Sequence, residues 1–194
     1  VEIRERVGDE NMFLFGMTAD EVQALLDAGV SRVVVMPLYP QETKACAGTC
    51  LEEFERAFGE AMAERPEQPR PEVRTISHYW NAPGYLDALA QSVRDAWSYG
   101  PGKKLVASFH SIPVSFQTAG DTYPESTKAT AEGLASKLGI APEDMVLTYQ
   151  SRFDSRKWLG PFLEPELRRL AAEGVRVGQF KRMVSTDAVQ HALA

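Results

Sequence analysis

The sequence predicts an α/β protein built from two parallel-sheet units. Short apolar or β-branched runs alternate with amphipathic helical segments, glycines follow several of the helical segments, and Gly100-Pro101-Gly102 separates two such series. Strands that alternate with helices of this length favour parallel sheets with right-handed crossovers. We therefore expect two Rossmann-like units, over residues 1–100 and 101–194, with a cleft between them at the carboxyl ends of their strands.

Local signals mark each element of the first half. Capping boxes at Thr18 to Glu21 and at Thr49 to Glu52 predict two helix starts, and Gly29 predicts a helix end. The β-branched run over residues 31–36 is typical of a parallel strand buried on both faces. The expected order is a strand over 11–15, a helix over 18–29, a strand over 31–36, a helix from 49, a strand over 73–77 and a helix over 83–99.

The second half repeats this alternation. Gly139 and Gly174 predict the ends of two helices, as glycine does where the chain must enter the left-handed region. The expected order is a strand over 104–109, a long loop, a helix over about 124–138, a strand over 145–150, a helix over 164–173 and a strand over 175–180.

Composition excludes several functional classes. The 194 residues are 44% hydrophobic, which is enough for a buried core, and the chain is not expected to be disordered. The formal net charge of −6 argues against nucleic acid as a partner, because phosphate binding needs clustered Lys and Arg. No apolar run approaches the roughly 20 residues of a transmembrane helix, so we expect no transmembrane segment.

The cysteines argue against a resident metal centre. Cys46 and Cys50 are the only two, and neither has the further Cys or His partners that zinc or an iron–sulfur cluster requires. Two thiols without a disulfide framework fit a reduced, cytoplasmic protein. We expect no tightly bound cofactor.

Several expected strands run directly into aromatic or ionisable residues. The strand over 104–109 ends at His110, and the other strands are followed by residues 37–41, 78–80 and 151–153. In a doubly wound sheet these carboxyl ends line one edge, where ligands bind. An edge that collects aromatic rings, an imidazole and an arginine suits a flat, largely apolar ligand.

Four motifs occur in one order along the chain. They are Leu38-Tyr39-Pro40-Gln41, His110-Ser111-Ile112-Pro113, Gly120-Asp121-Thr122-Tyr123-Pro124, and Gln150-Ser151-Arg152-Phe153 with Trp158-Leu159-Gly160-Pro161. In content, order and spacing they resemble the ferrochelatase family. The resemblance covers most of the chain and implies part of a two-domain enzyme that lacks the family's amino-terminal region and its carboxyl-terminal end.

The resemblance implies that the protein inserts Fe²⁺ into a porphyrin, protoporphyrin IX or coproporphyrin III, in haem biosynthesis. His110 then corresponds to the family's metal-contacting, proton-accepting histidine. A neutral imidazole can do both near neutral pH, and a rigid pocket can hold the macrocycle distorted. Porphyrin and Fe²⁺ are the expected partners, both as substrates. The candidate porphyrin-binding residues are Tyr39, Pro40, Ser108, Ser111, Pro113 and Arg152.

One position departs from the family pattern at the expected site. The family carries a glutamate on the helix after the last strand, and Gln190 stands at the matching position as the second candidate catalytic residue. An amide has no charge and does not take up a proton. The sequence therefore predicts impaired activity, and a non-catalytic porphyrin- or haem-binding homologue is the alternative.

Other interpretations stay open for several of these residues. A different α/β enzyme, such as a hydrolase with Ser108 or Ser111 as nucleophile, is disfavoured because the chain has no Gly-x-Ser-x-Gly elbow. His78 is expected to be a loop residue in contact with Tyr79 or Trp80, and Trp158 to pack in the core of the second unit. Arg152 could anchor a carboxylate such as Asp154 or Asp121.

Overall fold

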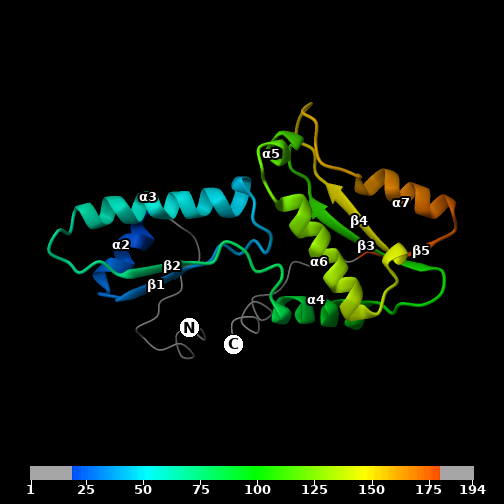
Figure 1. Cartoon of the computed structure of the whole chain (residues 1–194), viewed down its shortest axis with the longest axis horizontal. Coiled ribbons are helices and arrows are strands. Elements are labelled where there is room, and N and C mark those ends of the chain that lie inside the picture. The colour runs from blue at the N-terminus through cyan, green and yellow to red at the C-terminus, as the bar shows by residue number, and fades with distance from the viewer. Residues whose placement is uncertain (1–18, 180–194) are drawn as a thin grey trace. The chain divides into compact units, whose positions relative to one another are not determined.

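The computed structural model describes residues 19–179, and these form an α/β protein with two small parallel sheets (Figure 1). The chain divides into two compact units, Val1–His78 and Tyr79–Ala194. The expected strand over residues 11–15 and the position of Gln190 lie outside the described residues.

The first unit places two helices on one face of a two-stranded sheet. The sheet pairs β1 with β2 in parallel, and Val33 is the register partner of Val73. In chain order the elements are α2 (Ala19–Asp27), β1 (Arg32–Val35), the π-helical turn η1 (Lys44–Gly48), α3 (Thr49–Ala63) and β2 (Glu72–Thr75).

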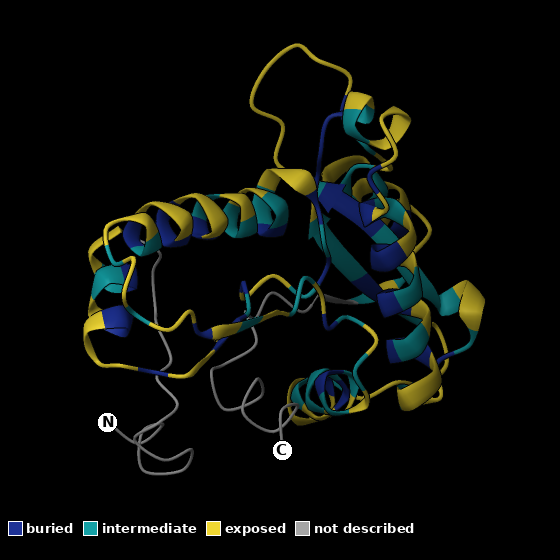
Figure 2. Cartoon of the chain, turned by 60° about the vertical axis from the view of Figure 1, so that its left-hand side comes forward, coloured by how far each residue is buried: buried dark blue, intermediate teal, exposed yellow. Residues whose placement is uncertain are grey.

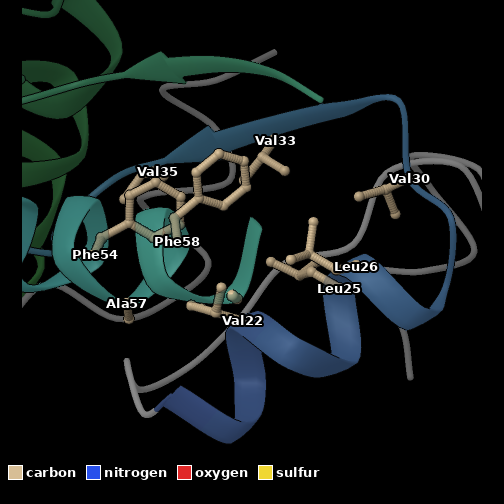
Figure 3. Close-up of a cluster of buried hydrophobic side chains, with 10 residues drawn as sticks. Val22, Leu25, Leu26, Val30, Val33, Val35, Phe54, Ala57 and Phe58 are labelled. Carbon is tan, nitrogen blue, oxygen red and sulfur yellow. The ribbon is translucent and has the colours of Figure 1, made fainter. Parts of the chain in front are cut away.

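The core of the first unit lies between these helices and the sheet. Val33 and Val35 of β1 point toward Phe54 and Phe58 of α3, whose rings stack with centroids 5.4 Å apart (Figure 3). One side of α3 is buried and the other exposed, as an amphipathic surface helix requires (Figure 2). Val34 is 50% exposed, so the expectation of a strand buried on both faces is wrong for β1 in the part of the chain that the structure describes.

The start of α3 also differs from the expectation. Thr49 does not cap the helix from outside, because the helical path already begins in η1. Thr43 is the capping residue of that turn, where its hydroxyl oxygen accepts a hydrogen bond from the backbone N–H of Ala45. The Thr49 hydroxyl donates instead to the carbonyl of Lys44, at 2.7 Å. A π-helical turn satisfies the backbone groups that the predicted capping box would have satisfied.

The second unit is built on a three-stranded parallel sheet with the order β4-β3-β5. At the carboxyl end of β3, His110 is the register partner of Gln150 of β4. The elements in chain order are α4 (Pro83–Ala96), β3 (Lys103–His110), α5 (Val114–Thr118), α6 (Tyr123–Leu138), the 3-10 turn η2 (Pro142–Asp144), β4 (Met145–Gln150), α7 (Leu163–Ala172) and β5 (Arg176–Gln179).

Helix α4 packs in the second unit, whereas the sequence placed it in the first. Its buried Ala90 and Val93 share a core with Leu105 of β3 and Leu134 of α6. The two helices approach closely at Gly133, where a Cβ atom would meet Leu86 at 3.0 Å. The units therefore divide between His78 and Tyr79, while Gly100-Pro101-Gly102 forms a connection inside the second unit.

Most other boundaries follow the sequence closely. Gly139 ends α6 in the left-handed conformation, with φ of 65°, as the sequence predicts. Helix α5 lies where the sequence predicts only a long loop, because five residues are too few for a periodic signal. Among the described residues, none of the helices is long and apolar enough to cross a bilayer.

Candidate active site

His110 is the last residue of β3, the central strand, and its side chain is exposed. Its Nδ1 lies 2.7 Å from the backbone carbonyl oxygen of Ser111. A carbonyl oxygen only accepts hydrogen bonds, so Nδ1 must carry the proton and donate it. In the neutral ring Nε2 then has the free lone pair, which is the form that can accept a proton or contact a cation.

Backbone hydrogen bonds hold the residues around His110. The N–H of Ser111 donates to the carbonyl of Gln150, at the end of β4, over 2.7 Å. The Ser111 hydroxyl donates to the carbonyl of Leu159 at 2.8 Å, and the residue is only 1% exposed. The carbonyl that accepts the hydrogen bond from Nδ1 thus belongs to Ser111, whose own N–H and hydroxyl groups are both hydrogen-bonded.

Tyr123 secures the backbone from the opposite direction, and sequence reasoning did not assign it this role. Its hydroxyl donates to the carbonyl of His110 at 2.9 Å, from the first turn of α6. Its own N–H donates to the carboxylate of the buried Asp121 at 3.0 Å, a contact typical of an aspartate that stabilises a turn. The Gly-Asp-Thr-Tyr-Pro motif was the signal that could have identified this contact.

A second anchor under the site joins α6 to β4. The hydroxyls of Thr127 and Tyr149 lie 2.7 Å apart, and both residues are buried. Thr127 already donates to the carbonyl of Pro124, so the Tyr149 hydroxyl is the donor between the two. Burial raises the pKa of Tyr149 above its ordinary value, which keeps the phenol protonated.

Aromatic side chains from the loop after β4 lie beside the imidazole. The rings of His110 and Phe153 have centroids 5.4 Å apart and an interplanar angle of 31°. Phe153 meets Trp158 edge to face at 5.5 Å, and Trp158 is buried, as the sequence predicts. The Trp158 indole N–H donates to Asp154, which also pairs with Arg156. Hydrogen bonding from Arg156 lowers the pKa of Asp154 to about 2, so this carboxylate is ionised at neutral pH.

The candidate porphyrin-binding residues of the second unit occupy different positions. Ser108 precedes His110 by two residues on the same face of β3, and its buried hydroxyl has no hydrogen-bond partner in the described part of the chain. Pro113 is buried and forms a bridge with Trp158. Arg152 is exposed, with its guanidinium carbon 4.3 Å from the centroid of the Phe162 ring. The arginine that pairs with Asp154 is Arg156 rather than Arg152.

Tyr39 and Pro40 belong to the first unit, in the loop between β1 and η1. Tyr39 is 46% exposed and Pro40 half-buried. His78 contacts the carboxylate of Glu42 at 3.4 Å and the hydroxyl of Ser77 at 3.1 Å, both within the same unit. It is therefore a loop residue, as expected, whereas its contact with Tyr79 or Trp80 stays a prediction. The assignment of Tyr39 and Pro40 to a porphyrin site stays a prediction.

The arrangement around His110 suits acid–base or cation chemistry better than nucleophilic catalysis. The Ser111 hydroxyl donates to a backbone carbonyl, and Nδ1 of His110 faces the Ser111 carbonyl rather than its hydroxyl. No group of three or more His, Cys, Asp or Glu side chains gathers to hold a metal ion within residues 19–179. Neither Cys46 nor Cys50 forms a disulfide bond.

Comparison with known proteins supports one family for this fold and site. The family model for ferrochelatase matches residues 15–179. A ferrochelatase of Vibrio atlanticus (strain LGP32) is 37% identical over 156 residues, which are 80% of this chain and 47% of that relative. A ferrochelatase of Methylibium petroleiphilum is 38% identical over 159 residues, or 81% and 42% of the two chains. The chain thus spans less than half the length of these relatives, and it belongs to the ferrochelatase family.

Proposed function

We propose that this chain carries part of the active site of a ferrochelatase, a lyase of haem biosynthesis that inserts Fe²⁺ into a porphyrin. The observation that supports this most directly is His110, exposed at the carboxyl end of the central strand with Nδ1 bonded to a carbonyl. This bond leaves Nε2 as the nitrogen that meets a substrate. Fe²⁺ and the porphyrin, protoporphyrin IX or coproporphyrin III, are both substrates in this proposal.

The chemistry of metallation explains why such a nitrogen is useful. A free-base porphyrin loses two pyrrole protons as the metal enters, so the reaction needs a proton acceptor close to the ring. A neutral imidazole accepts a proton near neutral pH and can also contact the incoming cation. The exposed Arg152, beside Phe162, is positioned to pair with a carboxylate of the ligand.

The proposal extends to the first unit through Tyr39 and Pro40. Both follow β1 in a loop at the carboxyl end of a parallel strand, the position at which α/β sheets bind ligands. We propose that two Rossmann-like units enclose the porphyrin and that Tyr39 contributes an aromatic wall. A Tyr39→Ala variant should then bind porphyrin more weakly, as measured by titration of the porphyrin absorption band. A cytoplasmic location also stays a prediction.

Gln190 supports a weaker activity than the family's glutamate would confer. Its amide provides no negative charge to attract the cation. This same residue favours the second candidate function, in which the protein binds a porphyrin or haem without inserting metal. The two functions differ in one observable property, because metallation converts the free-base absorption bands into metalloporphyrin bands whereas binding only shifts them.

The decisive experiment is an insertion assay on this chain with Fe²⁺ or Zn²⁺ and each porphyrin, followed by absorbance. His110→Ala should lower turnover by on the order of a hundredfold or more, as loss of a general base does. His78→Ala is the matched control, since His78 contacts Glu42 and Ser77 in the first unit. Equal turnover in the His110 variant and the unmodified chain, with normal folding, would exclude the assigned role.

A second substitution separates an impaired enzyme from a binding protein. Gln190→Glu introduces the missing charge, and its field in a partly dry site should favour cation entry. Turnover should rise if Gln190 limits the reaction. Porphyrin binding without metallation in both forms would favour the binding homologue, and strong activity that is unchanged by the substitution would contradict the predicted impairment.

A further inference from the structure

Phe153 is a large apolar side chain that folding alone does not explain. It is 73% exposed, more than Val34, Leu38, Tyr39 or Tyr99, the other exposed large hydrophobic residues of the described chain. A side chain this exposed contributes little burial to stability. Its ring contacts are with His110, at a centroid distance of 5.4 Å, and with Trp158, at 5.5 Å.

In the contact between Phe153 and Trp158, several interactions hold the Trp158 side chain in place. Trp158 is only 8% exposed, its backbone bridges to Pro113, and its indole N–H donates to Asp154 at 3.1 Å. Arg156 contacts both partners, because it pairs with Asp154 and its guanidinium carbon lies 5.4 Å from the centroid of the Trp158 ring. Phe153 therefore contacts an indole that is held in place, although most of its own side chain is exposed to solvent.

The backbone before Phe153 also adopts a specific turn. Ser151, the first residue after β4, has φ of 70°, in the left-handed region that non-glycine residues rarely enter. Such a conformation persists only where the surroundings impose it, and it is common at functional sites. Here it lies two residues before the ring that contacts His110.

His110 needs such a support. Its hydrogen bond from Nδ1 to the Ser111 carbonyl restrains one edge of the ring, and the residue is exposed. The ring of Phe153, tilted by 31° against the imidazole at a centroid distance of 5.4 Å, restricts the motion that remains. The hydrogen bond selects the tautomer, and the contact with Phe153 restrains the ring plane.

We propose that Phe153 is a positioning residue, which holds the imidazole plane of His110 so that Nε2 keeps one direction. The consequence for metallation rests on the proposed function, whereas the positioning itself does not. Reaction rates depend steeply on such alignment, because a base that is displaced by about 1 Å can cost a hundredfold. Partial loss of order should cost less, on the order of tenfold.

The first test needs no porphyrin. Nuclear magnetic resonance of the histidine side chains, at a pH where the rings are neutral, reports the tautomer, the order of the ring and the ring-current shift from a neighbouring phenyl group. The chain contains only three histidines, and His110→Gln identifies the signals of His110 by their loss. We expect Phe153→Ala to abolish the ring-current shift and to lower the order of the His110 ring in side-chain relaxation measurements, while the hydrogen bond from Nδ1 keeps the tautomer unchanged.

Matched variants separate the loss of the aromatic ring at position 153 from a general loss of structure. Phe153→Leu keeps an apolar side chain without a ring and should behave like Phe153→Ala, whereas Phe153→Tyr should preserve the His110 signals. Tyr99→Leu removes another exposed aromatic, which lies near Asp144 at the opposite end of the strands, and should leave His110 unchanged. Unchanged order of the His110 ring in both the Ala and the Leu variants would overturn the proposal.

The second test links position to chemistry by a double-mutant cycle. Phe153→Ala should lower kcat about tenfold with little change in KM, and should cost nothing further once His110 is already alanine. An equal loss in both backgrounds would show that Phe153 acts without His110, and would refute the proposal. Altered His110 spectra in a chain that never metallates porphyrin would instead leave the positioning intact and count against the proposed function.

Discussion

The two units use their parallel sheets differently. In the first unit, β1 alternates exposed and buried residues, and Val34 stands half exposed beside the buried Val33. In the second unit, β3 lies between two partner strands, and its adjacent Leu105 and Val106 are both buried. The candidate functional residues reflect this difference. His110 continues the central strand into a network of hydrogen bonds, while Tyr39 follows the first unit's strand in an exposed loop.

The comparison shows what holds a functional side chain in place. The end of β4, the start of α6 and the loop after β4 all contact His110 or its adjoining peptide. A residue beyond a strand of a two-stranded sheet has fewer such neighbours. The second unit therefore holds its candidate functional side chain, His110, more firmly than the first unit holds Tyr39.

The largest expected effect concerns the core of the second unit. Leu105 is 2% exposed, and truncation to alanine leaves a cavity, so Leu105→Ala should lower the free energy of unfolding by about 2–5 kcal/mol. Leu38→Ala, at a residue 48% exposed, should change it by less than about 0.5 kcal/mol. Denaturant titration measures both. Hydrogen exchange of the Leu105 variant should show lost protection in β3 and β4 but not in α3, and equal loss in α3 would mean that the two cores unfold together.

Alkaline pH should act on the second unit through Tyr79. Burial raises the pKa of Tyr79 to about 12, against about 10 for tyrosine in an unfolded chain. Between these values the unfolded state releases the proton and the folded state keeps it, so the free energy of unfolding should fall with rising pH by roughly 2–3 kcal/mol. Tyr79→Phe should reduce this alkaline loss, as measured by denaturant titration at a series of pH values. An identical pH dependence in the variant would show that other groups cause it.

Substitutions at the two members of the buried hydroxyl pair, Thr127 and Tyr149, should lower the free energy of unfolding by unequal amounts. Thr127→Val removes the acceptor of the buried Tyr149 hydroxyl and should cost about 1–3 kcal/mol, the penalty of an unsatisfied buried polar group. Tyr149→Phe leaves Thr127 still donating to the carbonyl of Pro124, and should cost only about 0.5–1.5 kcal/mol. Thermal and denaturant unfolding give both values. The reverse order would contradict the assigned direction of the hydrogen bond.

The smallest expected effect tests the open face of β1. Val34→Ala should change the free energy of unfolding by no more than about 0.5 kcal/mol, because the side chain is half exposed. The same change at its buried neighbour, Val33→Ala, should cost about 1.5 kcal/mol or more. Similar costs at both positions would show that a further layer covers Val34 in solution.

Local patterns in the sequence were enough to place most elements. Strand and helix positions in the second half agree with the structure to within one or two residues, because the alternating runs, Pro83 and the glycines at 139 and 174 act on their own neighbourhood. The position of His110 at a strand end follows from the same local signals. The ordered motifs were also sufficient to indicate the family, which the match over residues 15–179 confirms.

Contacts between distant residues decided the rest. The side of the domain boundary on which α4 falls depends on Ala90 and Val93 packing against Leu134 and Leu105. The exposure of Val34 depends on whether a second layer covers the sheet, and a β-branched run carries no record of that.

At the site, the sequence by itself determined that an imidazole follows a buried strand within the family's motif. Only the tertiary structure decided which nitrogen is free and what lies against the ring. The Ser111 carbonyl turns toward Nδ1 because residues up to 48 positions away hold Ser111, and Phe153 reaches the ring from a loop that begins after another strand. The sequence specifies the chemistry of each side chain, whereas the orientation of a side chain depends on neighbours that only folding brings together.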